Sequence, residues 1–320
     1  MDGWLQAIGK APAVLVTVAA VEGSGPREPG AKMLVTEGKV ADTIGGGHLE
    51  QRAIEIARGM IGARQERRFE RFALGPGLGQ CCGGVVHLAF ERVDAAQATK
   101  LRERVREDSW RLVALDGEPD AALFDGEGRM LCGTGAPAFD RSRGTHVMQD
   151  ERGRRWLADA VFAPRAHLVL FGAGHVGAAI VRALADLPCT VTWVDEREDM
   201  FPASVPANVT VEATDIPEAL VAEAPAGASY LVMTHSHALD QRLTEAIMAR
   251  GDVGWFGLIG SHTKRMQFEH RLRARGVDEA RIEAMVCPIG LPGIANKAPS
   301  VIAASVAAQL LGVWEAKSRQ

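Results

Sequence analysis

The feature that most constrains the fold is a glycine-rich turn between two apolar stretches in the C-terminal half of the chain. An apolar run, HLVLF, leads into GAGHVG, and the apolar residues that follow have helical spacing. A second apolar run then ends at Asp195. This order predicts a strand, a helix and a parallel strand. Further apolar runs at 229–235, 255–261 and 285–289 predict that the sheet continues in the same way.

The glycines of that turn have the spacing GxGxxG, because they are Gly172, Gly174 and Gly177. In a Rossmann-like fold this turn lets the backbone approach a phosphate, and the following helix N-terminus offers N–H groups to it. Asp195 lies about 20 residues further on, where a ribose hydroxyl is held in such folds. The pattern predicts a phosphate-containing ligand, and the alternative is that the glycines serve only the turn.

The N-terminal half predicts a mixed α+β domain. Val-rich residues 14–21 and the segment 32–36 have the composition of strands, joined by the loop GSGPREPG. After the triple glycine at 45–47, apolar residues at steps of four, three and four predict a helix. The segment RQERRFERFALG is ambiguous between strand and helix, whereas VVHLAFERV and the stretch from 110 to 135 predict strands.

These patterns give two domains and a connection. We expect an N-terminal α+β domain over 1–140, an arginine-dense linker over 141–165 and a Rossmann-like doubly wound parallel sheet over 166–320. The fold class is therefore α/β. A formal net charge of -4 gives no sign of the clustered positive charge that nucleic-acid binding requires.

The N-terminus and the cysteines indicate the compartment. The first residues lack a basic leader with an apolar core, and no apolar run of about 18 residues is expected, so the sequence predicts a cytoplasmic protein without a membrane span. The five cysteines are odd in number and have no CxxC spacing. This pattern favours reduced thiols over a disulfide framework or a zinc knuckle.

Polar residues beside the glycine loops are candidates for ligand contacts. Successive backbone N–H groups in such loops bind anions, and basic side chains beside them add charge. Those basic residues are Arg27, Lys32, Lys264, Arg265 and Lys297. THSHALD, which follows a predicted strand, supplies His235, His237 and Asp240. These three are a minimal metal-binding set, and the preferred interpretation is a polar pocket wall or a histidine that caps the next helix.

The stretch GQCCGG places Cys81 and Cys82 next to Gly83 and Gly84. Backbone N–H groups of the glycines would favour a thiolate, and a thiolate suits a soft metal or sulfur transfer. The alternative is that one or both cysteines are small buried apolar residues.

Seven motifs in this order resemble one known family over nearly the whole chain. They are VEGSGPREPGAKMLV, IGGGHLE, GQCCGG, LVLFGAGHVG, MTHSHALD, GLIGSHTKR and CPIGLPG. Together they are similar to the xanthine dehydrogenase accessory proteins of the XdhC/CoxI family. The resemblance implies a cytoplasmic chaperone that binds the molybdenum cofactor (molybdopterin), holds it during sulfuration and inserts it into apo-xanthine dehydrogenase, an enzyme of purine catabolism.

The resemblance also implies partners and site residues. The partners would be apo-xanthine dehydrogenase, a cysteine desulfurase, the upstream proteins of molybdenum cofactor synthesis and a second copy in a homodimer. Cys82, with Cys81 as second candidate, would contact the molybdenum or relay sulfur to it. The other cofactor-binding candidates are Arg27, Lys32, His48, Gly172, Gly174, Gly177, Asp195, His235 and Lys264.

Two other functions stay open at this point. Asp195 favours an NAD(P)-dependent oxidoreductase, although NAD(P) is not the expected ligand and no catalytic Tyr-Lys pair surrounds the single tyrosine, Tyr230. The second is a scaffold for a desulfurase or a dehydrogenase that binds no ligand of its own. Neither accounts for the cysteine and glycine loops together, so no catalytic residue is expected.

Overall fold

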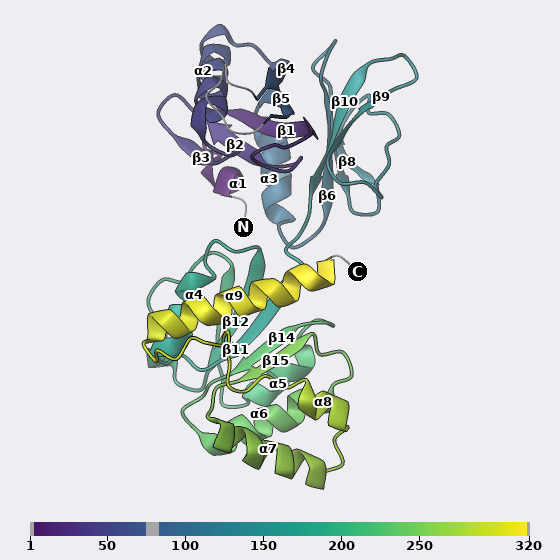
Figure 1. The fold of residues 1–320 in the computed structure, drawn as a ribbon. Helices are drawn as coiled ribbons and strands as arrows, with labels where there is room; N and C mark the ends of the chain where they lie inside the picture. The colour runs from purple at the N-terminus through teal and green to yellow at the C-terminus, as the bar shows by residue number, and fades with distance from the viewer. Residues whose placement is uncertain (1–2, 75–82, 319–320) are drawn as a thin grey trace. The chain divides into compact units, whose positions relative to one another are not determined.

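The structure is a computed structural model that describes residues 3–74 and 83–318. The chain divides into two compact units, with the boundary between Ala163 and Pro164 (Figure 1). The N-terminal unit contains two antiparallel sheets, and the C-terminal unit contains a parallel sheet. The predicted fold class is therefore confirmed: a Rossmann-like parallel sheet follows a mixed α+β region.

The first sheet of the N-terminal unit has the strand order β3-β2-β1-β5-β4, and every neighbouring pair is antiparallel. Its strands are β1 (Val14–Glu22), β2 (Lys32–Val35), β3 (Val40–Asp42), β4 (Arg67–Ala73) and β5 (Val85–Arg92). The ambiguous arginine-rich segment is thus strand β4. The accompanying helices are α1 (Gly3–Ala7), α2 (Gly47–Ala63) and α3 (Ala95–Glu103).

The second sheet has the order β8-β7-β6-β10-β9. Its strands are β6 (Ser109–Ala114), β7 (Ala121–Asp125), β8 (Met130–Gly133), β9 (His146–Gln149) and β10 (Arg155–Val161). The predicted linker over 141–165 is corrected here, because β10 pairs with β6 from Trp156 to Val161. The density of arginine in this segment suggested a solvated connection. In the structure, however, Arg154 and Arg155 form ion pairs with Asp120 and Asp116 within the N-terminal unit.

Apolar side chains join the two sheets. Ala19 and Ala89 of the first sheet pack with Val113, Leu115 and Leu157 of the second, and all five are buried. Helix α2 covers the opposite face of the first sheet with its apolar stripe, as its sequence spacing predicts.

The C-terminal unit has the strand order β13-β12-β11-β14-β15, with all neighbouring strands parallel. Its strands are β11 (Ala166–Phe171), β12 (Cys189–Asp195), β13 (Val209–Ala213), β14 (Ser229–Val232) and β15 (Trp255–Leu258). The strand order reverses between β11 and β14, and ligands of such sheets bind at this point, beyond the carboxyl ends of the strands.

Helices cover both faces of this sheet (Figure 1). α4 (His175–Ala183) and α9 (Pro299–Ser318) pack on one face, and α5 (Pro217–Glu223), α6 (His237–Ala249), α7 (His262–Ala274) and α8 (Glu279–Glu283) pack on the other; η2 (Glu198–Met200) follows β12. The predicted last strand at 285–289 forms only an isolated bridge from Val286 to Gly257. Pro288 supplies no N–H group with which a ladder could continue.

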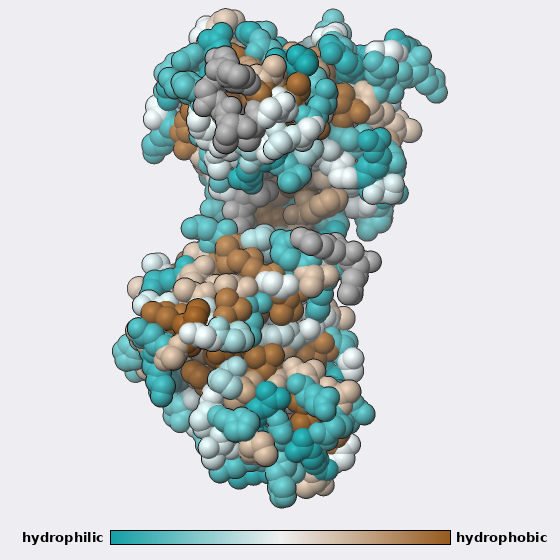
Figure 2. Space-filling view, in the orientation of Figure 1, coloured by the Kyte–Doolittle hydropathy of each residue, from teal (hydrophilic) through white to brown (hydrophobic). Residues whose placement is uncertain are grey.

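Helix α9 corrects one expectation about membranes. Within the described residues, its length and composition would also suit a membrane span, because its alanine and valine residues raise the average hydropathy. In the structure Ala303, Val306 and Leu310 of this helix are buried in the core shared with α4. Hydrophobic residues remain on the surface of the C-terminal unit where α9 crosses it (Figure 2).

Candidate functional site

The GxGxxG turn joins β11 to α4, and each of its three glycines has a distinct environment. Gly172 has a φ of 120°, and a Cβ there would lie 2.4 Å from the carbonyl oxygen of Met233. A Cβ on Gly177 would lie 2.1 Å from the carbonyl oxygen of Gly172. A Cβ on Gly174 would have no neighbour within 4 Å. Packing therefore requires the first and third glycines, whereas the second faces open space.

The N-terminus of α4 begins directly after this open glycine. Gly174 is the N-cap, makes no side-chain capping bond, and no acidic residue occupies the first turn. The first N–H groups of a helix have no acceptor inside it and carry the positive end of the helix dipole. These N–H groups are therefore available to an anion at the carboxyl edge of the sheet.

Asp195 ends β12 beside the turn and is 6% exposed. Its carboxylate accepts the backbone N–H of Ala173 at 2.7 Å and a two-pronged contact from Arg197, at 2.9 and 3.0 Å. Burial opposes ionisation, but the bonds from Arg197 and Ala173 outweigh it and lower the pKa of Asp195. A ribose hydroxyl would have to share this carboxylate with Arg197.

The segment after β14 forms a polar network of its own. The buried Asp240 carboxylate accepts the Thr234 hydroxyl at 2.7 Å and the Lys264 ammonium at 2.6 Å. Lys264, predicted as a ligand contact, is therefore the partner of Asp240. Its ammonium group also donates to the carbonyl of Ile259, just after β15, at 2.8 Å. His235 and His237 are exposed, and the described residues contain no group of three metal-ligating side chains. The minimal metal set is thus not assembled.

A small pocket lies at this edge of the sheet, with a volume of about 10 Å³. Its walls come from the ends of β11, β12 and β14 and the beginnings of α5 and α6. The lining residues are Phe171, Val194, Asp195, Glu196, Pro217, Thr234, His235 and Leu239. The structure thus brings together Asp195 and His235, which are 40 positions apart in the sequence.

In the N-terminal unit, three glycine loops meet at one end of the first sheet. A Cβ on Gly45 would lie 2.5 Å from Pro26, in the loop that contains Arg27. A Cβ on Gly84 would lie 2.3 Å from the carbonyl oxygen of Ser24. Arg27 and His48 are both exposed there. The described end of GQCCGG therefore lies against the loop GSGPREPG, which packs in turn on the triple glycine.

The triple-glycine loop differs from the predicted anion nest. The carboxylate of Glu50, in the first turns of α2, accepts the backbone N–H groups of Ile44 and Gly46, each at 3.0 Å, and the hydroxyl of Thr43. The protein's own carboxylate therefore occupies part of the position that an anion would take. An acidic residue in the first helical turn is a known sequence signal for such a contact.

The structure corrects the prediction that Lys32 contacts a ligand, because its side chain is buried between the two sheets. It is 8% exposed, and its ammonium group lies 2.7 Å from Asp159 of β10 and donates to the Gly30 carbonyl at 2.9 Å. Asp159 is fully buried and also accepts from Arg111 at 2.8 Å. Lys32 thus connects the two antiparallel sheets, and removing a partner from such a buried pair costs about 3–5 kcal/mol.

Cys81 and Cys82 lie outside the described residues, so the interpretation of GQCCGG stays a prediction. Two described cysteines, Cys189 and Cys287, are buried. Burial raises the pKa of the Cys189 thiol to about 11 and raises that of Cys287 as well. Neither is suited to act as a thiolate at neutral pH.

The strand order, the open glycine turn and the two antiparallel sheets define a protein in which a Rossmann unit follows a two-sheet N-terminal unit along the chain. Family models described as the XdhC Rossmann domain and the XdhC and CoxI family match residues 168–310 and 9–73, which is more than half of the chain. The chain belongs to the XdhC and CoxI family.

Known proteins resemble the chain along most of its length. A probable xanthine dehydrogenase subunit from Bacillus subtilis (strain 168) is 24% identical, over 93% of this chain and 92% of that protein. The uncharacterized protein YqeB of Escherichia coli (strain K12) is 25% identical over 94% of this chain, which spans only 43% of YqeB. A crystal structure of a xanthine dehydrogenase from Bacillus halodurans has a TM-score of 0.75 at 20% identity, covering 98% of this chain and 94% of that one, and shows the same fold.

Proposed function

We propose that this protein is an accessory factor in the maturation of a xanthine dehydrogenase, and that it binds the molybdenum cofactor as cargo before insertion. Membership of the XdhC and CoxI family supports the role in maturation. The Bacillus subtilis relative is named as a probable xanthine dehydrogenase subunit, which supports a xanthine dehydrogenase as the enzyme that receives the cofactor. The observation that carries cofactor binding is the open turn at Gly174, which precedes a helix N-terminus without a side-chain cap.

The residues at this turn fit a phosphate-bearing pterin. The first N–H groups of α4 would hold the phosphate, and the exposed His235 beside the small pocket would contact the ring system. Cys82, with Cys81 as second candidate, would lie near the molybdenum, because a thiolate is a soft ligand. Arg27 and His48 are exposed beside the loop that leads to these cysteines and would contribute charge and hydrogen bonds.

The remaining parts of the proposal follow from the family role. The protein would act in the cytoplasm as a dimer without catalysing a reaction of its own. It would take the cofactor from the proteins that synthesise it, hold it while a cysteine desulfurase supplies sulfur, and transfer it to the apo-dehydrogenase.

The test is an anaerobic titration with isolated molybdenum cofactor, followed by desalting and assay of retained molybdenum and pterin. The decisive variant is Gly174→Asp. A Cβ at this position has no neighbour within 4 Å, so we expect the fold to be kept, while the new carboxylate caps α4 and repels a phosphate. We expect at least a tenfold loss of cofactor retention, equivalent to about 1.4 kcal/mol, with no loss of thermal stability.

Gly251→Asp is the matched control. Gly251 is also exposed without a near neighbour, and it lies before β15 at the opposite edge of the same sheet. It should retain cofactor like the parent and support activation of apo-dehydrogenase. If the parent retains no cofactor, the chaperone proposal fails. If Gly174→Asp retains as much as the control, the glycine turn is not the binding site.

An NAD(P)-binding role is the second candidate, favoured by the position of Asp195 at the end of β12. NADH run through the same desalting assay separates the two. Retention of NADH with loss of the molybdenum cofactor would support an oxidoreductase.

A further inference from the structure

The carboxylate of Asp195, at the end of β12, already has a donor for each of its lone pairs. A carboxylate offers about four such positions, two on each oxygen. Oδ2 accepts the backbone N–H of Ala173 at 2.7 Å and Nη2 of Arg197 at 3.0 Å. Oδ1 accepts the backbone N–H of Arg197 at 3.1 Å and its Nε at 2.9 Å. A ribose hydroxyl would therefore have to displace one of these donors.

Arg197 supplies three of the four donors, and two of them belong to its side chain. The planar guanidinium matches the geometry of a carboxylate, so the two side-chain bonds act together. The side chain of Arg197 is 37% exposed, whereas that of Asp195 is 3% exposed. The guanidinium thus covers a buried carboxylate on the side that faces solvent, which is the side from which a ligand arrives.

The space beside Asp195 is also too small for a nucleoside. The small pocket that Asp195 shares with Thr234 and His235 has a volume of about 10 Å³. That is roughly the space of one water molecule. The sugar of a nucleotide could enter only after side chains at this edge had moved away.

The neighbours of Arg197 disfavour a phosphorylated ribose as well. Three acidic residues, Glu196, Glu198 and Asp199, are exposed next to it in the sequence. The hydrogen bond to Asp195 raises the pKa of Arg197, and the charges of Glu196 and Asp199 act in the same direction. The positive charge of Arg197 is therefore compensated within the protein, and a phosphate on the ribose would meet an acidic surface.

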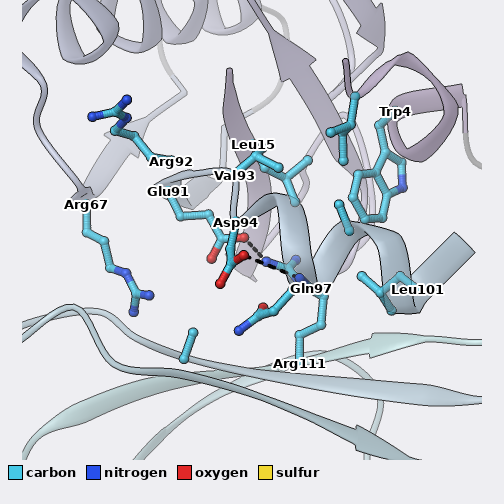
Figure 3. A pocket seen from close by; sticks show the side chains of 13 residues that line it. Trp4, Leu15, Arg67, Glu91, Arg92, Val93, Asp94, Gln97, Leu101 and Arg111 are labelled. Carbon is cyan, nitrogen blue, oxygen red and sulfur yellow. Dashed lines mark hydrogen bonds and ion pairs between the residues drawn. The ribbon is translucent and has the colours of Figure 1, made fainter. Parts of the chain in front are cut away.

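Another arginine, Arg111 of the N-terminal unit, also pairs with carboxylates, but it does so inside the core (Figure 3). Its side chain is 6% exposed and pairs with Glu91 and Asp159, beside a space of about 30 Å³. Removing Arg111 would leave buried charges unpaired, which is strongly destabilising. Removing the half-exposed side chain of Arg197 leaves Asp195 with two backbone N–H donors, so the fold should survive this change.

We propose that Arg197 is a specificity-determining residue, which restricts the glycine turn to ligands whose phosphate has no ribose beside it. The position of Asp195 is that of a ribose-binding residue in a dinucleotide-binding fold, but Arg197 makes its carboxylate part of the turn's own structure. The binding of a phosphate at α4 rests on the function proposed above. The closure of Asp195 by Arg197 does not depend on the cargo.

The test is isothermal titration of the full-length protein with ADP-ribose, which carries phosphates and ribose but no nicotinamide. The parent should show no saturable binding. Arg197→Ala should bind ADP-ribose roughly tenfold or more tightly than the parent, because one position on each Asp195 oxygen becomes free for a ribose hydroxyl. ADP-ribose with a 2′-phosphate should bind this variant roughly tenfold more weakly, since the phosphate faces Glu196 and Asp199.

Arg250→Ala is the matched control. Arg250 forms the same two-pronged contact with Asp252, at 2.8 and 2.7 Å, and the pair lies before β15 at the opposite edge of the sheet. Its Nη1 also donates to the carbonyl oxygen of Ala222 at 3.1 Å. This variant therefore loses more bonds than Arg197→Ala does. It should bind no ADP-ribose, which would exclude a general loosening of the unit as the cause.

Saturable binding of ADP-ribose by the parent would overturn the proposal. An Arg197→Ala variant that binds it no better than the parent would do the same. Arg197→Met, which keeps a long side chain without its donors, replaces Arg197→Ala if the latter fails to fold. Retention of molybdenum cofactor, measured on the same proteins, separates the two proposals: a parent that retains none contradicts the chaperone function, while the ADP-ribose comparison still decides the role of Arg197.

Discussion

Two glycine-rich turns in this protein lead from a strand into a helix, and they have opposite environments. The turn between β3 and α2 contains Gly45, Gly46 and Gly47, all with positive φ. The turn between β11 and α4 contains Gly172 and Gly174, of which only Gly172 has positive φ. From composition alone, both are candidate anion sites.

What separates the two turns is one side chain in the following helix. Glu50 of α2 reaches back to the N–H groups of Ile44 and Gly46, so the first turn is occupied from within the protein. α4 has no acidic residue in its first turn, and its N-cap Gly174 faces open space. Glycine content therefore predicts a turn that can bind an anion, and the neighbouring side chains decide whether the position remains available.

The largest expected effect comes from Gly177→Ala. The added methyl group would lie 2.1 Å from the carbonyl oxygen of Gly172, so α4 must shift away from β11. We expect destabilisation of about 3 kcal/mol, measured as faster hydrogen exchange of peptides from β11 and α4. Gly174→Ala makes the same change in the open part of the turn and should cost less than about 1 kcal/mol. Equal exchange in the two variants would show that the close approach is not rigid.

An intermediate effect is expected from Glu50→Ala, which makes the first turn resemble the second. The variant removes two hydrogen bonds from backbone N–H groups to a carboxylate. We expect a loss of about 1–2 kcal/mol, seen as faster hydrogen exchange at the start of α2.

Glu55→Ala is the control for this experiment, since Glu55 lies on the same helix and pairs with the exposed Arg52, at 3.0 Å. An exposed pair contributes about 0–1 kcal/mol. If both variants exchange alike, Glu50 does not hold the glycine loop, and the contrast between the two turns is lost.

The smallest effect concerns the pH dependence of the second turn. The pKa of Asp195 is lowered in the folded protein, because the bonds from Arg197 and Ala173 outweigh burial. A lowered pKa means that this carboxylate stabilises the fold above its ordinary pKa of 3.8, and that the contribution disappears as the pH falls through the folded value. The stability difference between the parent and Asp195→Asn should therefore shrink between pH 6 and pH 3.

Urea unfolding monitored by hydrogen exchange in β12 measures this difference. Asp186→Asn, an exposed change in the loop that precedes β12, should show no such trend. A difference that stays constant down to pH 3 would contradict the assigned hydrogen bonds.

Local sequence pattern was sufficient for most elements of the fold. The βαβ unit around GAGHVG, the apolar stripe of α2 and strand β5 all lie where periodicity and glycine position predict them. Strands β9 and β10 were missed because arginine density suggested an exposed linker, although Arg154 and Arg155, at the start of β10, pair with Asp120 and Asp116 in the turn between β6 and β7. A charged segment of a sheet has the same local composition as a solvated connection.

The candidate site likewise has some features that the sequence predicts and others that it does not. The sequence by itself determined the βαβ unit, the three glycines of its turn and the position of Asp195, because these depend on backbone conformation and on periods of two and 3.6 residues. Only the tertiary structure decided that Lys32 faces Asp159, that Lys264 faces Asp240 and that Glu50 fills the triple-glycine loop. The two ion pairs depend on which opposite charge the fold brings within reach, which residue spacing along the chain does not encode, and the Glu50 contact depends on the conformation of the loop before α2.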